Sequence, residues 1–174
     1  MKNTILQLCD YAGPYGGNFI ASLNCLDAIL EESGWRQVWI FSEIALGKSW
    51  LDELYSHGKN VKILRAGSVV QTIKNINKII AEESPCILHS HFDTFDIPVW
   101  AGAKLRNFQG YKCSAVWHMH TPFLVKRSFS RLIKDAIKLK IIGKGVFSIA
   151  VSSGGLKTMV ERGIPVKKSS VILN

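Results

Sequence analysis

Short apolar segments alternate along the chain with longer segments in which apolar residues recur every three or four positions. The short segments predict buried strands at Ile5–Cys9, Gln37–Phe41, Val61–Leu64, Cys86–His91, Ser114–His118, Phe147–Val151 and Val171–Leu173. The amphipathic segments between them predict helices at Gly17–Ser33, Lys48–His57, Val69–Glu83, Ile97–Asn107, Lys126–Ile142 and Gly155–Arg162. Such alternation predicts a doubly wound, Rossmann-like α/β fold with a parallel sheet flanked by helices.

The composition indicates an ordered globular protein. Of the 174 residues, 47% are hydrophobic and 20% are charged, which excludes an intrinsically disordered chain and fits one domain over residues 1–174. No apolar run approaches the length that spans a membrane, and the first residues lack the apolar core of a secretory signal. The four cysteines are far apart, which favours reduced thiols. We therefore expect a cytoplasmic protein.

A glycine-containing loop, Asp10–Gly17, joins the first predicted strand to the first predicted helix. Gly16 and Gly17 would let a ligand approach bare backbone amides at a helix start, where the helix dipole favours negative charge. The spacing is neither G-x-G-x-x-G nor that of a P-loop. Two interpretations remain open: a loop whose backbone amides contact a ligand, and a tight turn that only packs the helix on the strand.

Four of the five histidines lie at the ends of two strands. His89 and His91 share one face of the fourth strand, and His118 and His120 follow the same i, i+2 pattern at the end of the fifth. In the strand order 3-2-1-4-5-6, both ends lie beside the glycine loop, at the edge where open α/β sheets bind ligands. The histidines could hold a metal, line a polar cleft for a hydroxylated substrate, or have no functional role. We favour the cleft and expect no bound metal.

A row of basic residues accompanies the formal net charge of +9. Arg127, Arg131, Lys134 and Lys138 recur at intervals of four, three and four residues, so they would form one stripe on a helix. The stripe fits an ordinary solvated helix face, and it also fits docking to anionic lipid headgroups. Nucleic-acid binding is disfavoured, because no nucleic-acid recognition motif accompanies the charge.

The order and spacing of these segments resemble the N-terminal domain of retaining glycosyltransferases of family 4, which have the two-domain GT-B fold. The resemblance covers essentially the whole chain. The segments that carry it are Pro14–Gly17, Ser33–Trp35, Ile87–Phe92, the region of His120, Val151–Gly154, Arg162–Lys168 and Val171–Asn174.

The resemblance implies an enzyme of the hexosyltransferase type that uses a nucleotide-sugar donor. In that family the N-terminal domain mainly binds the acceptor, and the donor site with its paired glutamates lies in a C-terminal domain. We therefore expect residues 1–174 to be the acceptor-binding half of a longer protein, inactive when isolated. The expected acceptor is a saccharide or a lipid-linked glycan in bacterial surface polysaccharide synthesis, at or near the inner face of the plasma membrane. No cofactor is implied.

The resemblance also implies roles for individual residues. Gly16 and Gly17 match the loop that faces the donor phosphates and the acceptor. His120 best matches the histidine near the transferred sugar, although Thr121 stands where the family often has aspartate, and His118 is the alternative match. His91 is expected to line the cleft. Ser152, within the matching segment Val151–Gly154, is a further candidate for substrate binding.

Overall fold

The computed structural model describes residues 3–14, 19–65, 67–120 and 136–172. Within these residues one sheet of seven parallel strands has the order β3-β2-β1-β4-β5-β6-β7. Its strands are β1 (Thr4–Cys9), β2 (Arg36–Ser42), β3 (Val61–Leu64), β4 (Ile87–His91), β5 (Ser114–Met119), β6 (Phe147–Ala150) and β7 (Ser169–Val171). The predicted doubly wound fold and strand order are confirmed. Strand β7 begins two residues earlier than the sequence pattern predicted.

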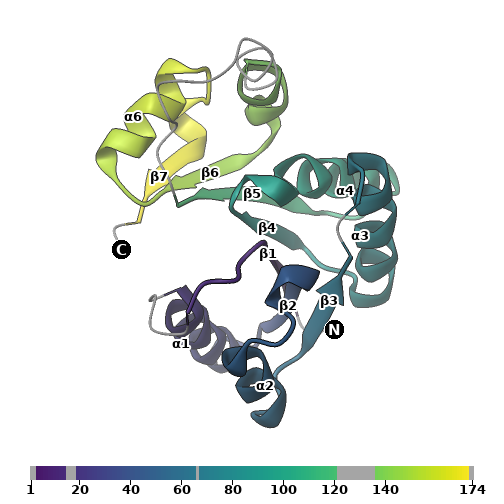
Figure 1. Cartoon of the computed structure of the whole chain (residues 1–174). Coiled ribbons are helices and arrows are strands. Elements are labelled where there is room, and N and C mark those ends of the chain that lie inside the picture. The colour runs from purple at the N-terminus through teal and green to yellow at the C-terminus, as the bar shows by residue number, and fades with distance from the viewer. Residues whose placement is uncertain (1–2, 15–18, 66, 121–135, 173–174) are drawn as a thin grey trace.

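Helices cover both faces of the sheet (Figure 1). The described α-helices are α1 (Phe19–Glu32), α2 (Ser49–Ser56), α3 (Val69–Glu83), α4 (Asp96–Phe108) and α6 (Ser153–Glu161). A helix was predicted over residues 126–142. Positions 126–135 of it lie outside the described residues, and its end, Lys138–Ile142, is a π-helix, η3. None of the described helices is both long and apolar enough to cross a bilayer.

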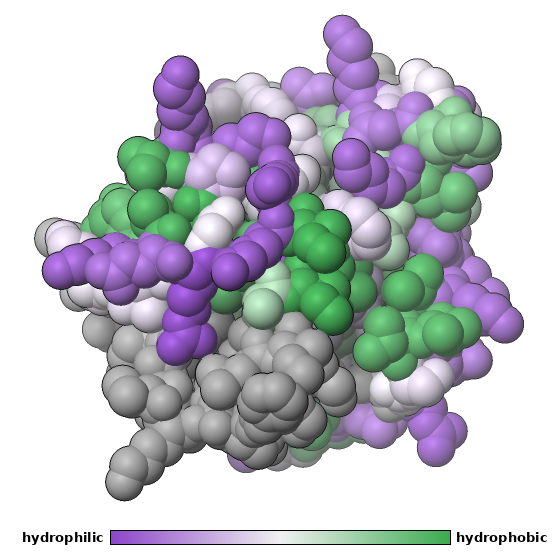
Figure 2. Space-filling view, turned by 90° about the horizontal axis from the view of Figure 1, so that it is seen from above, coloured by the Kyte–Doolittle hydropathy of each residue, from purple (hydrophilic) through white to green (hydrophobic). Residues whose placement is uncertain are grey.

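Two hydrophobic cores hold these layers together. On one face, residues of α1 and α2 such as Ile20 and Trp50 pack against Trp39 and Phe41 of the sheet. On the other face, residues of α3, α4, η3 and α6 pack against alternate residues of the same strands, including Leu88 and Trp117. Figure 2 shows one outer side of the protein, where hydrophilic side chains project around separate hydrophobic patches.

The register of the strands decides which side chains share a face. Cys9 of β1 is paired with His91 of β4, and His91 is paired with His118 of β5. Gln7 is paired in the same way with His89. Because paired residues in a parallel sheet point to the same side, all these side chains face the layer that contains α1. The residues between them, such as Ser90, face α3 and α4.

Candidate functional site

A pocket of about 750 Å³ lies between α1 and the sheet. Its apolar lining includes Leu26 and Ile29 of α1, Ile149 of β6 and Ile172 after β7. Four histidines also line it: His89 and His91 of β4, His118 of β5, and His120, which follows β5. The pocket reaches the carboxyl ends of these strands, where parallel α/β sheets bind ligands. It is mostly apolar with a few convergent polar groups, which is the usual composition of a small-molecule site.

A smaller cavity of about 260 Å³ lies elsewhere, at the amino ends of β5 and β6. Trp100, Lys104 and Phe147 are among its lining residues. The amino edge of a parallel sheet is not where such folds bind ligands. We therefore take the larger pocket as the candidate site.

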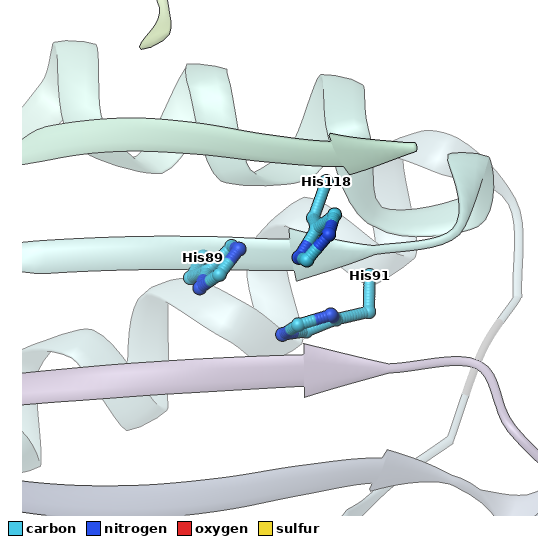
Figure 3. A group of neighbouring side chains, drawn as sticks. All are labelled: His89, His91 and His118. Atoms are coloured by element: carbon cyan, nitrogen blue, oxygen red, sulfur yellow. The ribbon is translucent and has the colours of Figure 1, made fainter. Parts of the chain in front are cut away.

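The four histidines form one group, which we call the histidine cluster: His89, His91, His118 and His120. Ring centroids are separated by 4.2 Å between His89 and His91, and by 4.3 Å between His118 and His120. The rings of His89 and His118 stack across the two strands at 5.4 Å. Figure 3 shows His89, His91 and His118 gathered on one face of the sheet. The convergence predicted from the sequence is confirmed.

Hydrogen bonding divides the cluster into two pairs. His91 lies between two partners: its Nδ1 is 3.0 Å from Nε2 of His120, and its Nε2 is 2.9 Å from Oε1 of Gln7. In contrast, Nε2 of His89 and both ring nitrogens of His118 are buried and have no hydrogen-bond partner among the described residues. Buried polar atoms of proteins nearly always have partners, so these unpaired nitrogens are hydrogen-bonding capacity that a ligand can use.

Burial keeps the cluster uncharged. It lowers the pKa of His89 to about 3 and those of His118 and His120 to about 4, and it lowers the pKa of His91 well below the usual value. For His89, His91 and His118, neighbouring histidines lower the pKa further, because one imidazolium opposes another nearby. At neutral pH each ring is therefore a neutral imidazole with one donor and one acceptor nitrogen.

The same rings meet the simplest requirement of a metal site. His89, His91 and His118 each offer a ring nitrogen, and these atoms lie within 4.8 Å of one another. Zinc prefers such neutral imidazole ligands. Both nitrogens of His91 are already engaged, however, one by His120 and the other by Gln7. A metal would have to displace at least one of these partners.

Aromatic rings enclose the histidine cluster at the strand ends. Phe92 stacks on His120 with ring centroids 4.6 Å apart, and Phe19 meets His120 edge-on at 5.3 Å. The backbone of Phe92 has φ 68° and ψ 166°, a region that is occupied almost only by glycine. A phenylalanine held there costs roughly 1–3 kcal/mol of strain, and strain of this kind is concentrated at functional sites.

The start of the glycine loop and the residue that begins α1 also belong to this enclosure. Tyr11 lies near the start of the loop and Phe19 after it; both line the pocket, and their rings are 4.8 Å apart. The carboxylate of Asp10 accepts hydrogen bonds from Ser42 and Thr94, and the Trp50 indole donates to the Gly13 carbonyl at 3.0 Å. These bonds hold the end of β1 against β2 and the segment after β4. Gly16 and Gly17 themselves lie outside the described residues.

The other predicted site residues lie in different surroundings. Ser152 is the N-cap of α6: its hydroxyl accepts a hydrogen bond from the Gly155 amide at 3.0 Å, and it is not among the residues that line the pocket. Three members of the basic stripe, Arg127, Arg131 and Lys134, lie outside the described residues, as does Thr121.

For the fourth member of the stripe the prediction of an exposed, lipid-facing position is wrong. The ammonium of Lys138 is buried and forms an ion pair with Asp96 at 2.5 Å. It also lies over the Trp117 ring, 5.3 Å from its centroid. A lysine committed to a buried carboxylate in this way is not available to a lipid headgroup.

The sequence reasoning missed three residues of the site: Gln7, Gln37 and Phe92. Gln7 and Gln37 are buried and hydrogen-bonded to each other at 3.0 Å. A signal was present, because glutamine is rare in the middle of a buried apolar strand such as Ile5–Cys9. Nothing in the sequence marks the unusual backbone of Phe92.

Solved structures share this fold. The chain aligns over 99% of its length with 43% of a glycosyltransferase from Rickettsia africae, at 19% identity and a TM-score of 0.76. It aligns over 98% of its length with 45% of the lipopolysaccharide outer core galactosyltransferase WaaB, at 18% identity and a TM-score of 0.69. The same domain shape occurs in a UDP-GlcNAc 2-epimerase from Methanocaldococcus jannaschii, with 98% of this chain covering 45% of that chain at 17% identity and a TM-score of 0.57.

These likenesses define the class of fold. The chain is an α/β domain that matches one half of GT-B glycosyltransferase structures, and it spans less than half the length of each structure named above. Neither a protein-family model nor a curated protein sequence matches it. Because an epimerase has the same domain, the fold alone does not select the reaction.

Proposed function

We propose that this chain is the acceptor-binding, N-terminal half of a retaining, family 4 glycosyltransferase. The full protein would move a sugar from a nucleotide-sugar to a saccharide or lipid-linked acceptor in bacterial surface polysaccharide synthesis. The observation that carries the proposal is the histidine cluster, which lines a pocket of about 750 Å³ together with Tyr11, near the start of the glycine loop. The likeness of the fold to one half of two glycosyltransferases supports it.

The chemistry of the pocket suits a sugar. Neutral imidazoles donate and accept hydrogen bonds, as hydroxyl groups do, and the apolar surface of Leu26, Ile29 and Ile149 suits the C–H faces of a sugar ring or the start of a lipid chain. His120 is the proposed contact to a hydroxyl of the transferred sugar, with His91 and His118 beside it. Stabilisation of the leaving diphosphate would come from the second domain and from the helix start after Gly17.

A donor screen with the protein from the complete reading frame tests this proposal. We expect transfer from one class of nucleotide-sugar, and a loss of roughly 10- to 100-fold in kcat/KM for His120→Ala, because one hydrogen bond to the sugar is removed. His57→Ala is the matched control, since His57 lies at the end of α2, outside the pocket.

Three outcomes would contradict the proposal. Transfer by the 174-residue chain alone would show that no second domain is needed. An unchanged kcat/KM for His120→Ala would remove the role of His120. Conversion of a nucleotide-sugar to its epimer, without transfer, would assign the domain to the epimerase class instead.

The metal geometry supports a second candidate, a metal-dependent hydrolase that uses His89, His91 and His118. Elemental analysis of the protein purified without chelators separates the two. The transferase proposal expects less than about 0.1 equivalent of zinc, whereas stoichiometric zinc that is lost in His118→Asn would favour the hydrolase. A non-catalytic domain that binds a carbohydrate or a nucleotide is the remaining alternative, and the donor screen excludes it if transfer is observed.

Docking to an anionic membrane surface remains a proposal that rests on Arg127, Arg131 and Lys134, without Lys138. Co-sedimentation with vesicles of anionic or neutral lipid tests it. We expect binding to the anionic vesicles alone, with a loss when the three residues are replaced by glutamine. Equal, negligible binding to both kinds of vesicle would reject docking.

A further inference from the structure

A line of hydrogen bonds runs beneath the pocket, from the backbone of α1 to His120. It passes through the Leu23 carbonyl, Gln37, Gln7, His91 and His120, and we call it the amide relay. Nε2 of Gln37 lies 3.2 Å from the Leu23 carbonyl oxygen, and Nε2 of Gln7 lies 3.0 Å from Oε1 of Gln37. Oε1 of Gln7 then meets Nε2 of His91, whose Nδ1 meets Nε2 of His120.

The first bond of the relay fixes the direction of all the others. A backbone carbonyl can only accept a hydrogen bond, so Gln37 must present its NH₂ group to Leu23 and its oxygen to Gln7. Gln7 must therefore donate to Gln37 and present its oxygen to His91. Reversing either amide would place two oxygens against each other in a buried position, which is costly.

The direction carries through both rings. An amide oxygen only accepts, so Nε2 of His91 carries the proton. Since His91 is a neutral imidazole, its Nδ1 has the lone pair and accepts the bond from His120. Nε2 of His120 is therefore the donor nitrogen of that ring, which is neutral as well.

We infer that the amide relay holds His120 as the Nε2–H tautomer, so that its Nδ1 lone pair accepts a hydrogen bond from a substrate hydroxyl. Gln7 and Gln37 are then positioning residues, which act on the substrate only through His91 and His120. Phe92 and Phe19 add a clamp: one stacks on the His120 ring and the other meets it edge-on, so the ring cannot turn freely. The tautomer follows from the relay alone, while the hydroxyl contact rests on the proposed function.

The relay predicts which sugar analogues the pocket rejects. A lone pair on Nδ1 requires a hydroxyl that donates its proton. An O-methyl ether keeps the oxygen but lacks that proton, so it should bind as poorly as the deoxy sugar at the contacted position. The opposite tautomer, with a proton on Nδ1, would donate to the oxygen and would discriminate much less between hydroxyl and ether.

Nitrogen-15 NMR of the ring nitrogens tests the tautomer without any assay of activity. In the unaltered protein at pH 7.5 we expect protonated Nε2 and unprotonated Nδ1 for both His91 and His120. In Gln7→Met the acceptor for His91 is gone, and both rings should shift to a mixture of tautomers. In Gln7→Glu the pattern should be retained through a protonated carboxyl group, which burial favours, because its O–H can donate to Gln37 and its other oxygen can accept from His91.

Thr72→Val is the control for a merely structural effect. Thr72 is a buried polar residue of α3, and its hydroxyl accepts a hydrogen bond from the Gly67 amide, far from the relay in the fold. Its loss should lower stability while leaving both tautomers unchanged. In the full-length transferase, Gln7→Met should lower kcat/KM by about tenfold, with Gln7→Glu closer to the unaltered protein.

The outcomes separate the relay from the function. A proton on Nδ1 of His120 in the unaltered protein would overturn the inference, even if Gln7→Met does not fold. An unchanged His120 tautomer in a folded Gln7→Met protein would overturn it too. If the tautomers shift as expected but no O-methyl or deoxy analogue is rejected, the relay stands and the proposed contact to substrate fails.

Discussion

The two faces of β4 and β5 use buried polar groups in opposite ways. On one face, the Ser90 hydroxyl donates to Asp96 at 2.5 Å, Lys138 forms an ion pair with the same carboxylate, and the Trp117 indole donates to the Asp96 carbonyl at 2.9 Å. On the other face, His89 and His118 are neutral and have ring nitrogens without a hydrogen-bond partner in the part of the chain that the structure describes. The paired charges of Asp96 and Lys138 join α4 to η3. The unpaired neutral nitrogens beside the pocket are instead available to a ligand.

The largest effect should come from removing the ion pair between Lys138 and Asp96. In Lys138→Met the carboxylate of Asp96 remains buried without its counter-ion, which costs about 3–5 kcal/mol of unfolding free energy. Burial already raises the pKa of Asp96, and Lys138 and Ser90 oppose that rise. Removal of Lys138 should raise this pKa further, so the loss of stability should be greater at pH 7 than at pH 4.

Urea denaturation measures this loss. Lys140→Met is the matched control, since Lys140 belongs to the same π-helix but is exposed, and it should change the unfolding free energy by less than about 0.5 kcal/mol. A loss below about 1 kcal/mol for Lys138→Met would show that the ion pair does not carry the stability of this face.

The histidine face should make stability depend on pH. In the unfolded chain the four histidines bind protons near pH 6.5, while in the folded protein the pKa values of His118 and His120 are about 4 and that of His89 is about 3. The unfolded state therefore binds more protons between these values, and stability falls as pH falls below 6.5. From pH 7.5 to pH 5.5 we expect a loss of about 2–3 kcal/mol, discounted for the partial exposure of His118 and His120.

The pH range of this loss distinguishes the contribution of the histidines to stability from that of the carboxylates. Burial would raise the pKa of Glu83, but hydrogen bonds from Lys62 and Arg36 outweigh it and lower that pKa below 4.5. The contribution of Glu83 is therefore lost only at more acidic pH. Urea unfolding at pH 7.5, 6.5 and 5.5 measures the slope, which should be smaller in the double variant His89→Asn, His118→Asn. A flat profile would mean that the rings are not buried as described.

At the edge of the histidine face, Phe92 allows a test of backbone strain. Its positive φ favours glycine, so Phe92→Gly should be about 1 kcal/mol more stable than Phe92→Ala, although both lose the ring that stacks on His120. Phe95, three residues on, has φ −97° and provides the control, where alanine should be the better replacement. If the glycine and alanine variants ranked in the same order of stability at positions 92 and 95, the backbone of Phe92 would not be strained.

The fold followed from the sequence because its signals are periodic. Apolar strands such as Val61–Leu64 and amphipathic helices such as Val69–Glu83 have the same bounds in the structure as in the prediction. The spacing of the histidines and the strand order together placed both pairs at one edge. Local patterns of this kind are repeated many times, so single errors do not change the result.

The parts of the site that were not predicted depend on contacts between distant residues. In the sequence, Lys138 continues the basic stripe of the predicted helix. In the structure its ammonium forms an ion pair with Asp96, which lies 42 positions earlier. No periodic pattern in the sequence indicates this pairing. The bond between Gln7 and His91 joins β1 to β4 across the sheet. Such pairings follow from tertiary packing, which overrides the simpler expectation that a lysine on a helix faces solvent.

The smallest effect should come from two serines that differ in position but share one chemistry. Ser68 caps α3 and Ser152 caps α6, and each accepts a hydrogen bond from the amide three residues on. Replacement of either by alanine should cost about 1 kcal/mol of unfolding free energy.

If Ser152 only caps its helix, Ser152→Ala and Ser68→Ala should both leave binding and transfer unchanged. A fall in kcat/KM for Ser152→Ala alone, beyond about threefold at equal stability, would show that this hydroxyl also contacts substrate. The predicted binding role of Ser152 would then hold despite its position outside the pocket lining.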